Sequence, residues 1–266
     1  MNYRLGFIGC GNMAQAIAAG AIRGGVLPAG QVIASDPSDA NRAIFDQWGC
    51  ATSSANTDVV DRAQQIVLAV KPQVFPKVAP QLTGGVSDEQ VLISIMAGVS
   101  SAKINTLLGK PTRVVRVMPN TPALVGEGMA GIALGSEAKP GDDELAFELF
   151  GAVGQTIRLE EHEIDCINAV SGSGPGYVFY FAEAMERAAE QLGLGEHARR
   201  VVGQTLLGSA KLLVESGEPP QQLRRKVTSP GGTTQEACEL LDDLGVMDAI
   251  IKAMHAARRR AEELGK

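Results

Sequence analysis

The chain lacks several features that define whole classes of protein. Its four cysteines include no Cys-x-x-Cys pair, so neither a disulfide framework nor a zinc site is indicated and we expect no bound metal. A reducing compartment, the cytoplasm, fits this cysteine usage. No apolar run approaches the roughly 20 residues of a membrane span. The first residues lead into an apolar strand rather than a signal peptide, so no membrane partner is expected.

Excess positive charge is also lacking. The formal net charge is −6, and the run Arg258 to Arg260 is short and near the end of the sequence. A nucleic-acid partner would require a basic surface that neutralises phosphates, so none is expected. By contrast, 45% of the residues are hydrophobic. That content can supply one large core or two moderate ones.

A glycine-rich turn follows the first apolar stretch. Residues 5–8 read as a strand, Gly9-x-Gly11-x-x-Ala14 follows, and Asn12 to Arg23 has helical spacing. In a dinucleotide-binding unit the first glycine makes a tight turn, and the second lets the backbone approach a pyrophosphate. The third small residue lets the helix pack on the strand. The pattern therefore predicts a nucleotide site near the N-terminus.

The second expected strand, Gln31 to Ser35, ends in Ser35-Asp36-Pro37. An acidic residue at this place usually holds the ribose diol of NAD, whereas a small hydroxyl with a nearby cation leaves room for the 2′-phosphate of NADP. Ser35, Asp36 and Arg42 give conflicting signals, so the choice between NADPH and NADH stays open here. The alternative is that Ser35 and Asp36 only cap the next helix.

The two halves of the chain differ in pattern. Up to about residue 158, short runs rich in Val, Ile and Leu alternate with helical stretches, which predicts an α/β fold with a doubly wound, largely parallel sheet of Rossmann type. Beyond Glu160, long helical segments are broken by glycine and proline, which predicts an all-α domain. We expect domains at 1–160 and 161–266 with a ligand cleft between them. Strands are expected at 5–8, 31–35, 65–70, 91–96, 114–118, 131–134 and 155–159.

Three loops at expected strand ends expose backbone, at 69–73, 94–100 and 118–122. Ligands of open α/β sheets bind at such edges, although proline after a strand often just terminates it. Far downstream, Ser229-Pro-Gly-Gly-Thr-Thr234 opens a helix. This segment is either an anion-binding helix start or an ordinary helix start capped by threonine. The small residues from Ser171 to Gly176 indicate either tight packing or contact with a nicotinamide.

These segments resemble those of the pyrroline-5-carboxylate reductases, enzymes that make L-proline by reducing a cyclic imine with NAD(P)H. The resemblance runs along nearly the whole chain, and the last segment is similar to the family's signature. The segments that carry it are Gly6-Phe-Ile-Gly-x-Gly-Asn-Met-Ala14, Ala69-Val-Lys-Pro-Gln73, Ser94-Ile-Met-Ala-Gly98, Arg116-Val-Met-Pro-Asn-Thr-Pro122, Ser171-Gly-Ser-Gly-Pro175 and Ser229-Pro-Gly-Gly-x-Thr234.

The resemblance implies roles for individual residues. It places one group around the pyrophosphate, a second near the adenosine ribose and a third along the path to the nicotinamide. These groups are, in that order, Gly9, Gly11, Asn12 and Met13; Ser35 and Asn56; and Ala69, Val70, Lys71, Pro72 and Ala97. The substrate carboxylate would lie on the loop from Ser229 to Thr234, held by backbone N–H groups of Gly231, Gly232 and Thr233.

The implied reaction is hydride transfer from NADPH, with NADH as a possible substitute, to the C=N carbon of L-1-pyrroline-5-carboxylate, the last step of proline biosynthesis. The hydroxyl of Thr234 would hydrogen-bond the imine nitrogen. A threonine hydroxyl is a weak acid, so we assign it positioning and proton relay from water. Large apolar faces on the helices after residues 177 and 197 indicate a homodimer or a higher homo-oligomer of dimers.

Two positions depart from the family pattern. Asp36 stands where the family often has a smaller or neutral residue, and Lys226 stands where some relatives carry asparagine. The roles of Lys226 and of the three histidines stay open.

Two other functions compete with this one. A β-hydroxyacid dehydrogenase has a catalytic lysine on the first long helix of its second domain, but no lysine occurs from Ile164 to Leu194. A nucleotide-binding protein without turnover could share the first domain. The Pro-Gly-Gly-x-Thr segment argues against it, because a pure nucleotide sensor does not need such a loop.

Overall fold

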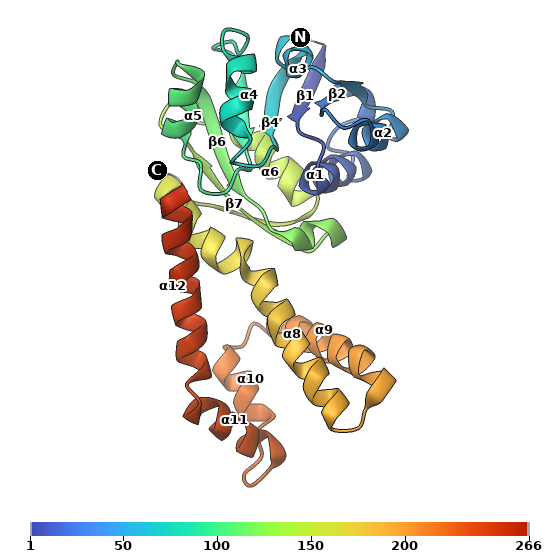
Figure 1. The fold of residues 1–266 in the computed structure, drawn as a ribbon, viewed down its shortest axis with the longest axis vertical. Coiled ribbons are helices and arrows are strands. Elements are labelled where there is room, and N and C mark those ends of the chain that lie inside the picture. Colours follow the sequence, from blue (N-terminus) through green and yellow to red (C-terminus); the bar gives the residue numbers. More distant parts are fainter. Residues whose placement is uncertain (1, 265–266) are drawn as a thin grey trace. The chain divides into compact units, whose positions relative to one another are not determined.

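In the computed structural model, residues 2–264 are described (Figure 1). The chain forms two compact units. The first comprises Met1–Ser173 together with Ala257–Lys266, and the second comprises Gly174–Ala256.

The first unit is built on an eight-stranded sheet in the order β3-β2-β1-β4-β5-β6-β7-β8. Neighbouring strands are parallel except for β6 and β7, so that β7 and β8 run against the rest. The order of the first six strands is that of a Rossmann fold, which confirms the predicted fold class. The strands are β1 (Tyr3–Ile8), β2 (Val32–Ser35), β3 (Ala51–Ser53), β4 (Ala63–Leu68), β5 (Val91–Ser94), β6 (Arg113–Met118), β7 (Gly128–Leu134) and β8 (Gly154–Arg158).

Helices cover both faces of this sheet, because successive strand side chains point to opposite faces. Phe7 faces the layer of α1, α2 and α6, whereas Ile8 faces the layer of α3, α4 and α5. Both side chains are fully buried. The helices are α1 (Asn12–Arg23), α2 (Asp39–Gln47) and α6 (Glu144–Gly151) on one face, and α3 (Asn56–Arg62), α4 (Phe75–Leu82) and α5 (Ser101–Leu108) on the other.

All seven expected strands are present, and the first helix has the expected bounds. The strand β3 was not predicted. It has three residues, Ala-Thr-Ser, all half-buried at the edge of the sheet. An element this short, without branched apolar residues, leaves no periodic signal in the sequence.

Short helical segments connect or follow the strands. The π-helical turn η4 ends at Gly172, close to the boundary between the units. The side chains of Met118 in β6, Ala133 in β7 and Ile164 in the short helix α7 form a small cluster. These segments are the 3₁₀ helices η1 (Ala29–Gln31), η2 (Thr121–Val125) and η3 (Glu161–Glu163), then α7 (Ile164–Ile167) and η4 (Asn168–Gly172).

The second unit is all-helical, as predicted. Its buried core is small and includes Ala189, Ala198 and Val202, while large apolar side chains such as Phe179 and Val214 are exposed by 67% and 80%. The helices are α8 (Gly174–Gln191), η5 (Gly195–His197), α9 (Ala198–Ser216), α10 (Pro220–Lys226), α11 (Thr233–Asp243) and α12 (Val246–Leu264), whose last residues belong to the first unit.

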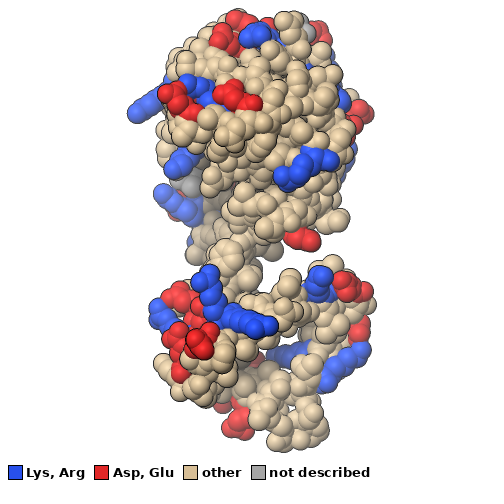
Figure 2. Space-filling view, turned by 90° about the vertical axis from the view of Figure 1, so that its right-hand side faces the viewer, with Lys and Arg blue, Asp and Glu red and all other residues tan. Residues whose placement is uncertain are grey.

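The surface carries both signs of charge. On the face shown in Figure 2, basic and acidic side chains are interspersed among wide uncharged areas. Within residues 2–264, no helix is both long enough and apolar enough to cross a membrane.

Candidate active site

The glycine-rich turn lies at the carboxyl edge of the sheet, where the strand order reverses between β1 and β4. Gly9 adopts a positive φ of 99°, and a Cβ atom there would lie 2.8 Å from the Ala69 carbonyl oxygen. Only glycine fits this turn. A Cβ atom on Gly11 would meet open space, and no side chain caps α1 at this residue. The first turn of α1 is therefore open to an anion, as the dinucleotide pattern requires.

The end of β2 holds this turn through hydrogen bonds. Gly9 N donates to the Ser35 carbonyl oxygen at 2.8 Å, and Cys10 N donates to Asp36 Oδ2 at 2.8 Å. Asp36 Oδ1 accepts from Ser38 N at 2.8 Å. Ser38, rather than Ser35 or Asp36, is the N-cap of α2. The capping alternative is thus wrong for the side chains of Ser35 and Asp36.

A groove of about 500 Å³ follows the turn along the carboxyl edge. Ser35 and Asn56, both expected near the adenosine ribose, lie on its wall and are joined by a 2.7 Å hydrogen bond from Ser35 Oγ to Asn56 Oδ1. Asn56 Nδ2 donates to Gln81 Oε1 at 2.8 Å, which ties α3 to α4. Two lysines, Lys71 and Lys77, also line this groove. Their charge suits the phosphates of a nucleotide.

A second groove of about 290 Å³ shares three lining residues with the first, so the two adjoin. The shared residues are Ala69, Val70 and Lys71. The remaining wall of the second groove is formed by Met13, Ile95, Met118, Pro119, Asn120, Thr121 and Gly172. Apart from Met13 of α1, these residues lie at the ends of β5 and β6, in η2 and in η4.

The other predicted cofactor residues lie beside these grooves. Asn12 is the first residue of α1. The Pro72 carbonyl oxygen accepts from Phe75 N at 3.3 Å where α4 begins. Ala97 packs against the cluster around Met118. Contact of all the predicted residues with a cofactor stays a prediction.

Asn120 is a groove residue whose role was not predicted from the sequence. Its Oδ1 accepts from Met129 N at 2.8 Å, and its Nδ2 donates to Ser171 Oγ at 3.1 Å. A Cβ atom on Gly172 would lie 2.5 Å from Met118 Cε. The small residues here therefore allow close packing and also form part of the groove wall. A Met-Pro-Asn-Thr run at a strand end was the signal that could have identified Asn120.

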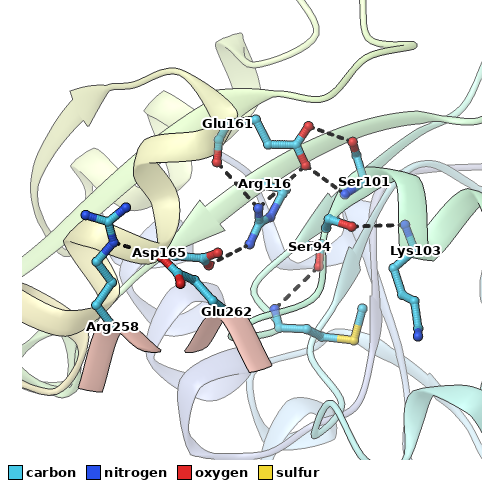
Figure 3. Close-up of polar contacts among 10 residues, drawn as sticks. Ser94, Ser101, Lys103, Arg116, Glu161, Asp165, Arg258 and Glu262 are labelled. Carbon is cyan, nitrogen blue, oxygen red and sulfur yellow. Dashed lines mark hydrogen bonds and ion pairs between the residues drawn. The ribbon is translucent and has the colours of Figure 1, made fainter. Parts of the chain in front are cut away.

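A buried ion-pair network lies next to this wall (Figure 3). Arg116, whose side chain is 5% exposed, pairs with Glu161 Oε1 at 3.5 Å and with Asp165 Oδ1 at 3.4 Å. Glu161 accepts from Ser101 N at 2.8 Å and from Ser101 Oγ at 2.7 Å at the start of α5. The network joins β6, α5 and α7, and thereby fixes the segment that leads to Ser171 and Gly172.

The predicted substrate loop lies in the second unit. Gly231 has a positive φ of 67°; its N–H donates to Gln235 Oε1 at 2.8 Å, and Gly232 N donates to the Ser229 carbonyl oxygen at 2.9 Å. Gly232 is the N-cap of α11, so the alternative of a threonine cap is wrong. Thr233 and Thr234 begin the first turn of α11.

Lys226, whose role stayed open in the sequence, forms an ion pair with Glu218 at 2.6 Å.

Among the residues that the structure describes, no cluster of His, Cys, Asp or Glu is placed to hold a metal ion.

Comparisons with known proteins bear on both units. The family described as "NADP oxidoreductase coenzyme F420-dependent" matches residues 4–98, and "Pyrroline-5-carboxylate reductase dimerisation" matches residues 161–264. The pyrroline-5-carboxylate reductase of Pseudomonas aeruginosa is 41% identical over 99% of this chain and 97% of its own length. The chain belongs to the pyrroline-5-carboxylate reductases.

Solved structures of pyrroline-5-carboxylate reductases agree with this membership. The structure from Coxiella burnetii is 37% identical, covers 100% of both chains and has a TM-score of 0.87. The Plasmodium falciparum structure, which has NADP bound, is 29% identical, covers 100% of this chain and 99% of its own, and has a TM-score of 0.88. The expected resemblance to the pyrroline-5-carboxylate reductases is confirmed over the full chain.

Proposed function

We propose that this protein reduces the C=N bond of L-1-pyrroline-5-carboxylate with NADPH to give L-proline, the last step of proline biosynthesis. The observation that carries this function is the similarity of the whole chain to pyrroline-5-carboxylate reductases, at 41% identity over 99% of its length. The two adjoining grooves at the carboxyl edge of the sheet agree with a nucleotide-dependent reaction.

The first unit binds and orients the cofactor. When bound, the reduced nicotinamide supplies the hydride. Gly9 and Gly11 let the backbone approach the pyrophosphate, and the open first turn of α1 faces its charge. Lys71 and Lys77 add positive charge along the nucleotide groove. The groove wall around Met13 and Asn120 would exclude water from the nicotinamide end.

The loop from Ser229 to Thr234 is proposed to hold the substrate carboxylate at the start of α11. The Gly231 N–H donates to the side chain of Gln235 in α11, and the Gly232 N–H donates to Ser229 within the loop. Substrate binding through Gly231 therefore requires Gln235 to release that N–H. The Thr233 N–H lies in the first turn of α11, where backbone donors lack intrahelical acceptors. The hydroxyl of Thr234 would position the imine nitrogen and relay a proton to it from water.

The direct test is loss of NADPH absorbance by the purified protein when pyrroline-5-carboxylate is added, with NADH in parallel. We expect oxidation of NADPH that depends on the imine. Protein that is folded and binds NADPH but shows no imine-dependent oxidation would contradict the proposal and favour the non-catalytic nucleotide-binding alternative.

Thr234→Ala tests the proposed substrate loop. We expect kcat to fall by about tenfold to a hundredfold, because positioned proton transfer contributes at least that much, while the melting temperature stays unchanged. Thr233→Ala is the matched control, since it keeps the backbone N–H and removes the adjacent hydroxyl. An unchanged kcat in Thr234→Ala, or equal losses in both variants, would overturn the assignment.

The second unit is proposed to contribute the dimer interface, with residues 1–160 as the nucleotide domain and 161–266 as the dimerisation and substrate-binding domain. The protein forms homo-oligomers through a dimerisation domain of its family; we propose the homodimer as the basic assembly, with higher assemblies built from dimers. The four cysteines are free, which supports the reducing cytoplasm as the proposed compartment.

A further inference from the structure

Asp36 directly follows β2, at the place where an acidic residue usually binds the ribose diol of NAD. In this structure its carboxylate points inward. Oδ2 accepts from Cys10 N and Oδ1 from Ser38 N, each at 2.8 Å. The residue is 9% exposed. Both oxygens are thus occupied by backbone donors, although the residue borders the nucleotide groove.

The bond to Cys10 fixes the middle of the glycine-rich turn. Cys10 lies between Gly9 and Gly11 and is 0% exposed. Without the Asp36 carboxylate, its buried N–H would lose its hydrogen-bond acceptor. An unsatisfied buried donor is costly, and the turn would shift to find another partner. Such a shift would move Gly11 and the first turn of α1, which face the pyrophosphate.

Asp36 is itself held firmly in place. Its N–H donates to the Ser53 carbonyl oxygen at 3.3 Å, and its carbonyl oxygen accepts from Arg42 Nη1 at 2.5 Å. Arg42 also pairs with Asp39, so this guanidinium is already engaged by two acceptors. Four hydrogen bonds in all connect Asp36 to the glycine turn, α2 and β3.

We propose that Asp36 is a positioning residue for the cofactor pyrophosphate and not a ligand of the ribose diol. The consequence is that Asp36 does not select NADH over NADPH. Loss of the Asp36 carboxylate weakens the binding of NADPH and of NADH equally, because both cofactors contain the pyrophosphate. This inference rests on the proposed function in one respect, because it takes NADPH and NADH as the ligands of the groove.

Asp36→Asn tests the inference, because the amide has the same shape but can offer an acceptor to only one of the two N–H groups. We expect the KM values for NADPH and NADH to rise together by about tenfold, as for loss of a charge-assisted hydrogen bond. The ratio of the two KM values should stay within about twofold of the original, and kcat should change little. Asp61→Asn changes an exposed carboxylate of α3 in the same way; it is the matched control and should leave both KM values unchanged.

Three results would overturn the inference. A rise in the KM of NADH alone would identify a diol ligand, a fall in the KM of NADPH would identify a group that repels the 2′-phosphate, and no change would remove the positioning role. Calorimetric binding of NADPH and NADH without the imine gives the same comparison independently of turnover. A failure of the proposed reaction therefore stays distinguishable from a failure of this inference.

A test on the unaltered protein covers the case in which Asp36→Asn does not fold. A crystal structure of the unaltered protein with NADH shows what the Asp36 carboxylate binds when the diol is present. We expect Oδ2 and Oδ1 to keep their hydrogen bonds from Cys10 N and Ser38 N. An Asp36 oxygen within hydrogen-bond distance of either ribose hydroxyl would overturn the inference.

Discussion

At the scale of single residues, the cysteine in the glycine-rich turn contributes its backbone to the site while its thiol is buried. Burial, followed by repulsion from Asp36, raises the pKa of the Cys10 thiol to about 12. Burial, followed by repulsion from Asp46, raises the pKa of the Cys50 thiol to about 11. Both thiols are therefore neutral at physiological pH and are poor nucleophiles.

These raised pKa values predict a loss of stability in alkali. Above pH 9 the thiols ionise in the unfolded chain but not in the folded one, so the unfolded chain binds fewer protons and the free energy of unfolding falls as pH rises. Each thiol contributes up to about 1.4 kcal/mol per pH unit, from pH 9 to about 11 for Cys50 and to about 12 for Cys10.

Urea unfolding between pH 8 and pH 11 measures this effect, with the double variant Cys10→Ala, Cys50→Ala as reference. We expect the free energy of unfolding to decline more steeply for the unaltered protein than for the variant above pH 9. A constant offset between the two curves at every pH would contradict the prediction.

At the scale of elements, an ion pair ties β6 to the turn before α6. Arg113 Nε donates to Asp142 Oδ2 at 2.9 Å, and the Asp142 side chain is 3% exposed. Burial raises the Asp142 pKa, but hydrogen bonds from Arg113 and from Lys139 N outweigh burial, and the net pKa is lowered. The pair therefore stabilises the fold above the carboxyl's ordinary pKa and loses this effect as pH falls through the folded-state pKa.

Arg113→Met removes the cation and leaves Asp142 buried. We expect the free energy of unfolding at pH 7 to fall by about 3–5 kcal/mol, as for other buried pairs that lose one partner. The difference from the unaltered protein should shrink below about pH 4, where Asp142 of the variant is protonated.

Urea unfolding at both pH values measures this difference. Arg4→Met, which removes an exposed pair with Glu148, is the control and should cost at most about 1 kcal/mol. If Arg113→Met cost no more than Arg4→Met, the buried pair would not hold β6 to this turn.

At the scale of the whole molecule, the exposed apolar surface of the second unit explains why this protein forms homo-oligomers. An apolar groove of about 450 Å³ there is lined by Tyr177, Tyr180, Phe181, Leu244, Val246, Ala249, Ile250 and Ala253. Phe179, on α8 with the three aromatic residues of this groove, is 67% exposed. A monomer rarely leaves so much contiguous apolar surface in water.

Phe179→Glu should weaken self-association, because a charge in an apolar interface must be desolvated without a partner. We expect the dimer dissociation constant, measured by sedimentation over a range of concentrations, to rise about a hundredfold or more. Gln47→Glu adds the same charge at an exposed polar position of α2 and should sediment like the unaltered protein. Equal sedimentation of Phe179→Glu and Gln47→Glu at every concentration would exclude Phe179 from the interface.

The sequence by itself determined the architecture and the cofactor-binding turn, because both depend on local pattern. Alternation of apolar runs with helical stretches fixes a parallel sheet covered by helices. Glycine at Gly9 is required by the turn itself, and a small residue at Gly11 leaves room for a pyrophosphate. Motifs along the whole chain led to the family without any knowledge of how distant segments meet.

Only the tertiary structure decided which way the polar side chains at the site point. Asp36 bonds to Cys10 across 26 positions, Asn120 to Ser171 across 51, and Arg116 pairs with Asp165 across 49. Such partners share no periodicity or spacing, since each pair meets because two strand ends or a strand and a helix pack together. From the sequence alone, the Asp36 carboxylate could bind either the ribose or backbone N–H groups of the glycine-rich turn. The position of the Cys10 N–H decides between these two roles.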